Sequence, residues 1–170
     1  MSPRPSKAKK LIFCIRGFTI VEVMVVVAIL GILGSIALPS FLNSIHQRAV
    51  ANLAVDMAND IQMAKSEALK SRTNVQFVVA NDNSGHQVVS NPGASQVQLK
   101  SVAYSSYSSV TVAANGSRTI TFSGTFNRPA EALTNSDYFT ASRGSANLRV
   151  QVNPAGLVTI CGGFGGHPSC

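Results

Sequence analysis

The chain has 170 residues, with fourteen basic and seven acidic side chains and a formal net charge of +7. This length is that of one domain and accommodates one modest hydrophobic core together with a membrane segment. The positive charge suggests a nucleic acid or an acidic membrane as partner, but five basic residues lie before Phe18, and nine basic and seven acidic residues follow. The basic character therefore belongs mainly to the N-terminal segment.

Residues 1–17 form a short basic leader, and residues 18–38 form an apolar run of 21 residues. As a helix, this run is long enough to cross about 30 Å of hydrocarbon. By the positive-inside rule, the leader stays in the cytoplasm and the rest of the chain is exported across the bacterial inner membrane. We therefore expect a single-pass protein with a periplasmic C-terminal domain.

Glu22 lies inside the apolar run, where a carboxylate costs about 2.5–3.5 kcal/mol on insertion scales. A secretory signal peptide is one interpretation of the run, because Ser35-Ile-Ala37 fits a cleavage site. However, the run is longer than usual for that class and contains the glutamate. An ordinary membrane anchor leaves Glu22 unexplained, unless its side chain simply reaches the interface.

Beyond Pro39, where we expect a kink, apolar residues recur every three or four positions and predict an amphipathic helix. The helix should run from Phe18 to about Arg72, with residues 18–42 as its membrane half and residues 43–73 as its amphipathic half. The apolar positions are Val50, Leu53, Met57, Ile61, Ala64 and Ala68. The polar face should carry Asn52, Asp56, Asp60, Lys65, Glu67 and Lys70.

From Asn74 onward, short segments rich in β-branched residues alternate with turn sequences. They predict an α+β fold in which residues 74–170 form an antiparallel β-sheet that covers the apolar face of the long helix. Two stretches, Tyr104–Ser109 and Thr134–Ala146, are predicted as loops. The predicted strands are 75–79, 87–89, 97–102, 118–122, 148–152 and 157–161.

Cys161 and Cys170 lie near the C-terminus, whereas Cys14 lies in the leader. If the C-terminal part is exported, the first two cysteines meet an oxidising compartment and should form a disulfide. Zinc is the alternative, with His167 between them, but this set supplies three ligands where a structural zinc requires four.

The residues after the long helix do not form a catalytic pattern. Only Asp82, Glu131 and Asp137 are acidic there, and the glycine-rich stretch 162–166 follows the last strand instead of opening a helix. The three histidines share no metal-ligand spacing. These histidines are His46, His86 and His167. We therefore predict no enzyme activity, no cofactor and no metal.

The sequence Arg16-Gly17-Phe18-Thr19-Ile20-Val21-Glu22 resembles the processing site of type IV prepilins and pseudopilins. This resemblance implies that a prepilin peptidase cleaves between Gly17 and Phe18 and that Phe18 is then N-methylated. It also implies that Glu22 pairs with the terminal amine of a neighbouring subunit. Such pairing agrees with electrostatics, because two charges in lipid neutralise each other only when subunits meet.

A second resemblance covers much of the remaining chain. The segment Leu53–Val75, with its Ala64-Lys-Ser-Glu-Ala68 core, is similar to the GspH/FimT family of minor pseudopilins, as are Ile120–Gly124 and Leu148–Gly156. This resemblance implies a pilin-like fold and a structural subunit at or near the tip of a type II secretion pseudopilus or type IV pilus. The implied partners are other pilins, the prepilin peptidase and inner-membrane lipid.

DNA uptake is the alternative function, because some FimT-type minor pilins capture DNA. Arg143 and Arg149 flank a loop rich in Gly and Ser that could lie against phosphates. Ordinary solvated arginines are the simpler interpretation of these positions. The other basic residues of the predicted sheet are Lys100, Arg118 and Arg128.

Overall fold

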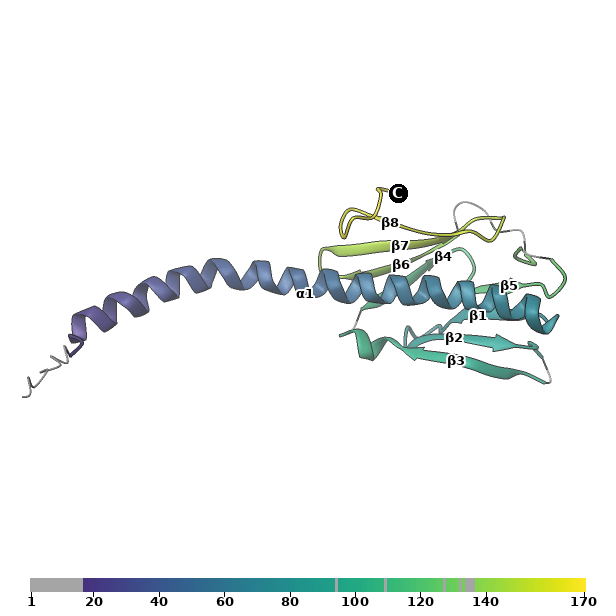
Figure 1. Cartoon of the computed structure of the whole chain (residues 1–170), viewed down its shortest axis with the longest axis horizontal. Coiled ribbons are helices and arrows are strands. Elements are labelled where there is room, and N and C mark those ends of the chain that lie inside the picture. Colours follow the sequence, from purple (N-terminus) through teal and green to yellow (C-terminus); the bar gives the residue numbers. More distant parts are fainter. Residues whose placement is uncertain (1–16, 94, 109, 127, 132, 134–136) are drawn as a thin grey trace, which may run out of the picture. The chain divides into compact units, whose positions relative to one another are not determined.

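The computed structural model describes residues 17–93, 95–108, 110–126, 128–131, 133 and 137–170 (Figure 1). Its first element is α1 (Ile20–Ser71), a helix of 52 residues. The predicted long helix is thus confirmed to within two residues at each end. The chain separates into two compact units after Pro39. Helix α1 continues through this proline.

In the first unit, the apolar part of α1 is exposed along the described side chains. Among the described residues, α1 is the one helix that is long and apolar enough to cross a membrane. Its valine, isoleucine and leucine side chains have no protein core to enter, so their burial requires lipid or other protein chains.

The second unit contains two four-stranded antiparallel sheets. Sheet 1 has the strand order β3-β2-β1-β5 and sheet 2 the order β4-β6-β7-β8. In sheet 1 the strands are β1 (Val75–Val79), β2 (Gly85–Ser90), β3 (Val97–Ala103) and β5 (Thr119–Phe122). In sheet 2 they are β4 (Thr111–Asn115), β6 (Tyr138–Arg143), β7 (Ala146–Val152) and β8 (Val158–Gly162).

The predicted α+β class is confirmed, but the prediction of a single sheet and of two loops was wrong. The stretch Thr134–Ala146 contains β6, which pairs with β7 across the two-residue turn Gly144-Ser145. Gly144 has φ +58, a conformation that tight hairpin turns require. The other supposed loop contains the 3-10 helix η1 (Tyr104–Tyr107), and β4 was not predicted.

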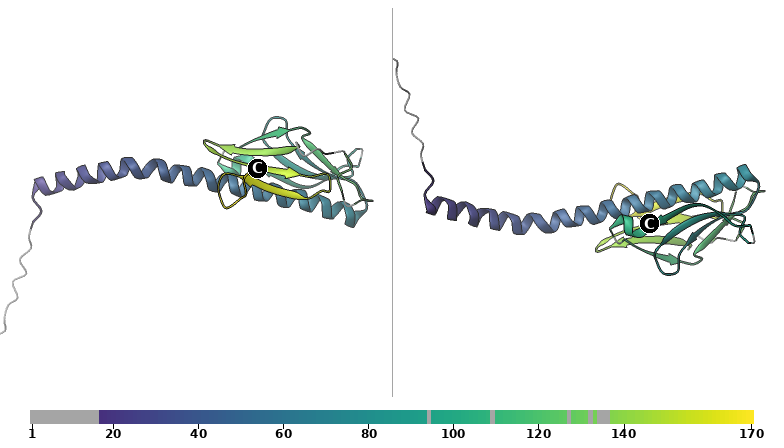
Figure 2. Two further views of the ribbon diagram at one scale, coloured as in Figure 1. Left: turned by 90° about the horizontal axis from the view of Figure 1, so that it is seen from above. Right: turned by 90° about the horizontal axis from the view of Figure 1, so that it is seen from below.

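The amphipathic half of α1 lies along both sheets (Figure 2). Its buried stripe joins side chains of sheet 1 and sheet 2 in one hydrophobic core, as expected for an apolar helix face that must be covered. The stripe residues, all 0% exposed, are Val50, Leu53, Ala54, Met57, Ile61, Ala64 and Ala68. Their sheet partners include Phe77 on β1, Phe139 on β6 and Leu148 on β7.

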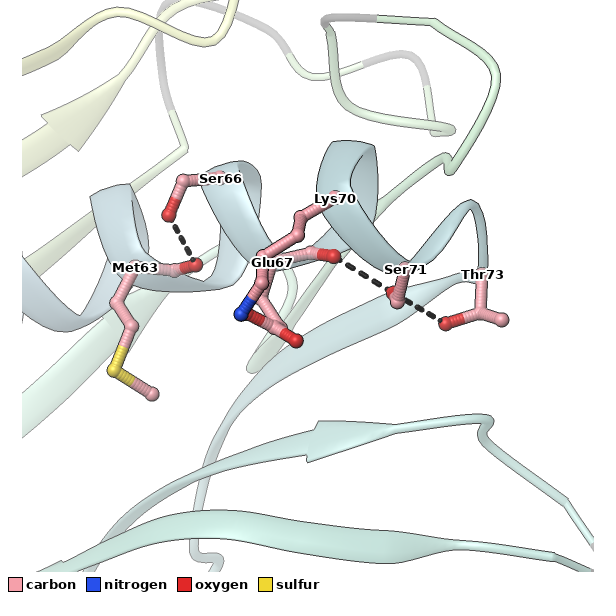
Figure 3. Close-up of polar contacts among 6 residues, drawn as sticks. All are labelled: Met63, Ser66, Glu67, Lys70, Ser71 and Thr73. Atoms are coloured by element: carbon pink, nitrogen blue, oxygen red, sulfur yellow. Dashed lines mark hydrogen bonds and ion pairs between the residues drawn. The ribbon is translucent and has the colours of Figure 1, made fainter.

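Hydroxyl groups and one ion pair support the last turns of α1 (Figure 3). Ser71 Oγ donates to the carbonyl oxygen of Glu67 at 2.7 Å and lies 2.8 Å from Thr73 Oγ1. Lys70 pairs with Glu67 at 3.4 Å, and Ser66 Oγ donates to the carbonyl oxygen of Met63 at 2.9 Å. These contacts join side chains to one another and to backbone carbonyl groups within the last turns of the helix.

Candidate functional site

The N-terminal end of α1 is capped by Thr19. Its Oγ1 accepts a hydrogen bond from the backbone N–H of Glu22 at 3.2 Å, and its carbonyl oxygen accepts one from Val23 at 3.3 Å. A threonine followed three residues later by glutamate is a capping pattern. The helix therefore begins at Ile20, so that only Phe18 and Thr19 lie between the Gly17–Phe18 bond and the first helical residue.

Gly17, Phe18 and Glu22 are all exposed, and Phe18 is 80% exposed. A Cβ atom added to Gly17 would meet nothing within 4 Å, so packing within the described chain does not require glycine there. The Glu22 carboxylate forms no ion pair with another residue in the part of the chain that the structure describes. The segment is thus accessible to another protein, and the Glu22 charge is available to one.

A second polar site lies between α1 and sheet 1. Asp60 on α1 is only 2% exposed, and its two carboxylate oxygens have different partners. His86 Nε2 on β2 lies 2.8 Å from Oδ2, and Lys100 Nζ on β3 lies 2.5 Å from Oδ1. Since a carboxylate buried without partners is strongly unfavourable, these contacts fix Asp60 between the helix and the sheet.

The prediction that Asp60 lies on the polar face of the helix was wrong. It lies three residues after Met57 and four before Ala64, which places it on the same face as the apolar stripe. Asp56, one turn earlier, is half-buried and accepts a hydrogen bond from the Tyr107 hydroxyl of η1. Burial, together with this hydrogen bond, raises the pKa of Tyr107 to about 12.

Two glycines of the segments that resemble the GspH/FimT family pack directly against α1. A Cβ atom on Gly124 would lie 2.3 Å from the carbonyl carbon of Arg72, just past the helix end. Gly156 has φ +74, and its carbonyl oxygen accepts a hydrogen bond from Lys65 Nζ at 3.0 Å. Both glycines therefore allow loops of the β-rich part to approach the helix closely.

The candidate DNA residues do not converge. On β7, Arg149 alternates with the buried Leu148 and Val150 and lies on the outer face, where its guanidinium stacks 4.6 Å from the Tyr138 ring centroid. Arg143 lies two residues after the buried Ala141 on β6 and therefore on the same, inner face of the strand; its Nη1 atom is buried. The two arginines therefore project from opposite faces of sheet 2.

Three other basic residues of the β-rich part are also engaged within the chain. Lys100 pairs with Asp60, Arg118 donates to the carbonyl oxygen of Ala80 at 3.0 Å, and Arg128 lies 5.5 Å from the centroid of the Phe126 ring. A phosphate backbone requires several cations on one surface. These contacts direct the five basic side chains to different places.

Cys161 and Cys170 are joined by a disulfide bond, which confirms that the cysteines pair. Their thiolates are consequently not available to zinc. The N–H of Gly162 donates to the carbonyl oxygen of Pro168 at 2.7 Å, so the last residues fold back against β8, an edge strand of sheet 2. The tail thereby covers part of an edge that would otherwise be open to pairing.

Among the described residues, no group of three or more His, Cys, Asp and Glu side chains could hold a metal ion. In the polar cluster around Asp60, the two carboxylate oxygens are held by His86 and Lys100. Sequence reasoning missed this cluster. The position of Asp60 within the apolar stripe was the signal that could have identified it.

Comparison with known families gives two matches. Residues 53–156 match the family of the type II transport protein GspH, and residues 13–38 match the prokaryotic N-terminal methylation motif. A probable minor fimbrial protein of Dichelobacter nodosus is 36% identical over 84 residues, which are 47% of this chain and 51% of that protein. The chain thus matches only about half the length of this curated relative.

Two crystal structures of the type IV minor pilin FimU from Pseudomonas aeruginosa have a similar fold. One has a TM-score of 0.54 at 13% identity and covers 65% of this chain and 87% of FimU. The other has a TM-score of 0.52 at 15% identity and covers 65% and 90%. At these identities the similarity establishes the pilin-like fold.

Proposed function

Because the chain belongs to the GspH family of type II transport proteins, we propose that it is a minor pilin or pseudopilin, a structural subunit of a secretion pseudopilus or type IV pilus. The observation that carries the proposal is the combination of a methylation motif at residues 13–38 with a GspH-type domain at residues 53–156 in one chain. The pilin-like fold supports the same role. A subunit of this kind acts by assembly and requires no catalytic site.

Prepilin peptidase is the proposed processing enzyme, with cleavage between Gly17 and Phe18 and N-methylation of Phe18. The exposure of both residues supports access by a peptidase. A Cβ atom at Gly17 would meet nothing within 4 Å, so the packing of the described residues does not require glycine there. This supports a requirement for glycine that comes from a second protein, the peptidase. The Thr19 cap starts the helix two residues beyond the new N-terminus.

The proposed location of the unassembled protein is the bacterial inner membrane, with the leader in the cytoplasm and the β-rich unit in the periplasm. The basic leader and the exposed apolar part of α1 support this orientation, and the disulfide agrees with an oxidising compartment. Other pilins and inner-membrane lipid would then cover the apolar side chains that the described chain leaves exposed.

Glu22 is the proposed docking charge. In lipid its carboxylate is unfavourable alone, and the terminal amine of Phe18 after cleavage would be equally so. Pairing between the amine of one subunit and the carboxylate of the next removes both penalties only in the filament. The absence of an ion pair to Glu22 within the described residues supports this role.

A crosslinking experiment in cells tests the assembly role. Glu22→Ala should insert into the membrane normally but lose most crosslinking to partner pilins and most recovery in sheared filaments. Glu67→Ala is the matched control, because Glu67 is a helix glutamate whose partner is the exposed Lys70, and a surface pair contributes little. Equal assembly of the Glu22→Ala variant and the parent would contradict the docking role.

A further inference from the structure

His86 is the centre of a buried polar cluster that the proposed function does not use. It is 3% exposed, its Nε2 faces Asp60, and its ring packs 5.0 Å from the Phe77 ring and 5.6 Å from the Tyr104 ring, centroid to centroid. Its second nitrogen, Nδ1, is buried and has no hydrogen-bond partner among the residues that the structure describes. Because a carboxylate accepts, this arrangement holds the neutral ring with its proton on Nε2.

The ionisable groups around His86 come from α1, β3 and η1, whereas β1 contributes only uncharged side chains. Helix α1 contributes Asp60 and, one turn away, Asp56; β3 contributes Lys100; and η1 contributes two tyrosines. Lys100 already supplies one positive charge to Asp60. A second positive charge, on His86, would enter a buried site whose nearest carboxylate, Asp60, is already shared with Lys100. The tyrosines are Tyr107, which is hydrogen-bonded to Asp56, and Tyr104, whose buried hydroxyl has no partner within the described part of the chain.

We propose that His86 makes the attachment of β2, β3 and η1 to α1 sensitive to acid. A proton from solvent that binds Nδ1 creates a buried N–H donor with no acceptor, beside an Asp60 that already has a cationic partner. Opening this part of the structure hydrates His86 and removes that penalty. Protonation therefore favours a state in which β2, β3 and η1 have moved away from α1.

The opening is confined to this part of the second unit for two reasons. The strand β3 is an edge strand whose residues are exposed except for the half-buried Val102, so it has little core to hold it once Asp60 and Lys100 separate. Sheet 2 packs through apolar residues such as Phe139 and Val150. Among the described residues, the buried polar side chains are Asp60, His86 and Thr121.

The direction of the pH effect follows from the burial of His86. Burial lowers its pKa below the ordinary value of 6.5, more than the hydrogen bond to Asp60 raises it. The open state therefore binds the proton first, and the closed state is fully favoured above about pH 6.5. As the pH falls below this value, the open population rises by up to about tenfold per unit, until the closed state also takes up the proton.

Hydrogen exchange of the full chain in detergent micelles, at pH 7.5 and pH 5.5, tests the proposal. After correction for intrinsic exchange, we expect the protection of β2 and β3 amides to fall by about three- to tenfold, whereas β6 and β7 amides keep theirs. His86→Gln should abolish the difference, because the amide donates to Asp60 but does not titrate. His167→Gln, a half-buried histidine near the C-terminus, is the control and should respond like the parent.

Nitrogen-15 NMR of the parent provides a second measurement that does not depend on the variant folding. His86 should show an Nε2–H tautomer and a titration midpoint below 6.5; assignment uses the His46→Gln and His167→Gln variants. The proposal is overturned by a midpoint at or above 6.5 or by equal loss of protection in both sheets. It is also overturned if β2 and β3 do not change, or if the full pH response persists in His86→Gln. None of these outcomes depends on filament assembly.

Discussion

Replacing Gly124 by alanine tests how closely the β-rich part approaches the end of α1. A Cβ atom at this position would lie 2.3 Å from the carbonyl carbon of Arg72, 2.4 Å from the amide nitrogen of Thr73 and 2.7 Å from the Arg72 carbonyl oxygen. These are backbone atoms, which cannot rotate away as a side chain does. Either the loop after β5 or the helix end must therefore move.

Overpacking of this kind typically costs about 1–3 kcal/mol, and backbone on the opposing side favours the upper part of that range. Alanine also restricts the unfolded chain, which offsets about 0.4–1 kcal/mol. We therefore predict a net loss of about 2 kcal/mol for Gly124→Ala. With a urea dependence of about 2 kcal/mol per molar, the unfolding midpoint should fall by about 1 M.

Tyrosine fluorescence during urea unfolding of the full chain in micelles measures this change, since the chain has no Trp and its three Tyr residues lie in the second unit. Gly163→Ala is the matched control. A Cβ on the exposed Gly163 would meet nothing within 4 Å, so its midpoint should stay within about 0.3 M of the parent, given that surface changes are usually small. Equal midpoints for both variants would refute the close contact between Gly124 and the helix end.

Two further predictions concern the C-terminal disulfide and DNA. Replacing Cys161 and Cys170 by serine opens a loop with a sequence separation of nine, so we expect the free energy of unfolding to fall by up to about 3 kcal/mol and β8 to be proteolysed faster. Cys14→Ser is the control. Unchanged proteolysis of the double variant would show that the tail is held without the bond. The processed chain, residues 18–170, should bind duplex DNA weakly or undetectably near 150 mM salt, because Arg143 and Arg149 project from opposite faces of sheet 2. A protein that makes few phosphate contacts binds weakly and in a salt-sensitive way. Micromolar binding that disappears in the Arg143→Ala, Arg149→Ala double variant would support the DNA-uptake alternative.

The long helix was predictable because its determinants are local. An apolar run of 21 residues followed by apolar residues at spacings of three and four specifies both halves of α1 without knowledge of its partners. The Cys161–Cys170 pair was predictable for a similar reason, since few alternatives exist for two nearby cysteines in an exported segment. The family resemblances added Glu22 and the Gly17–Phe18 bond, which periodicity alone does not explain.

The strands β4 and β6 and the buried cluster were harder to predict because they depend on contacts distant in the sequence. The β6 segment, Tyr138–Arg143, alternates buried Phe139 and Ala141 with polar residues, but its short side chains and its place between polar stretches resemble a loop. Asp60 looked like a surface residue because carboxylates usually lie there. Its burial became evident only when β2 and β3 brought His86 and Lys100 beside it.

The most direct test of the pilin assignment is mass spectrometry of the N-terminal peptide of protein recovered from its native host. Cleavage by prepilin peptidase predicts a peptide that begins with N-methylated Phe18, and Gly17→Ala should leave the leader attached. A mature chain that begins at Leu38 would instead establish a secretory signal peptide cleaved after Ala37. Either that result or an intact leader on the native protein would contradict the proposal that this chain is processed as a minor pilin.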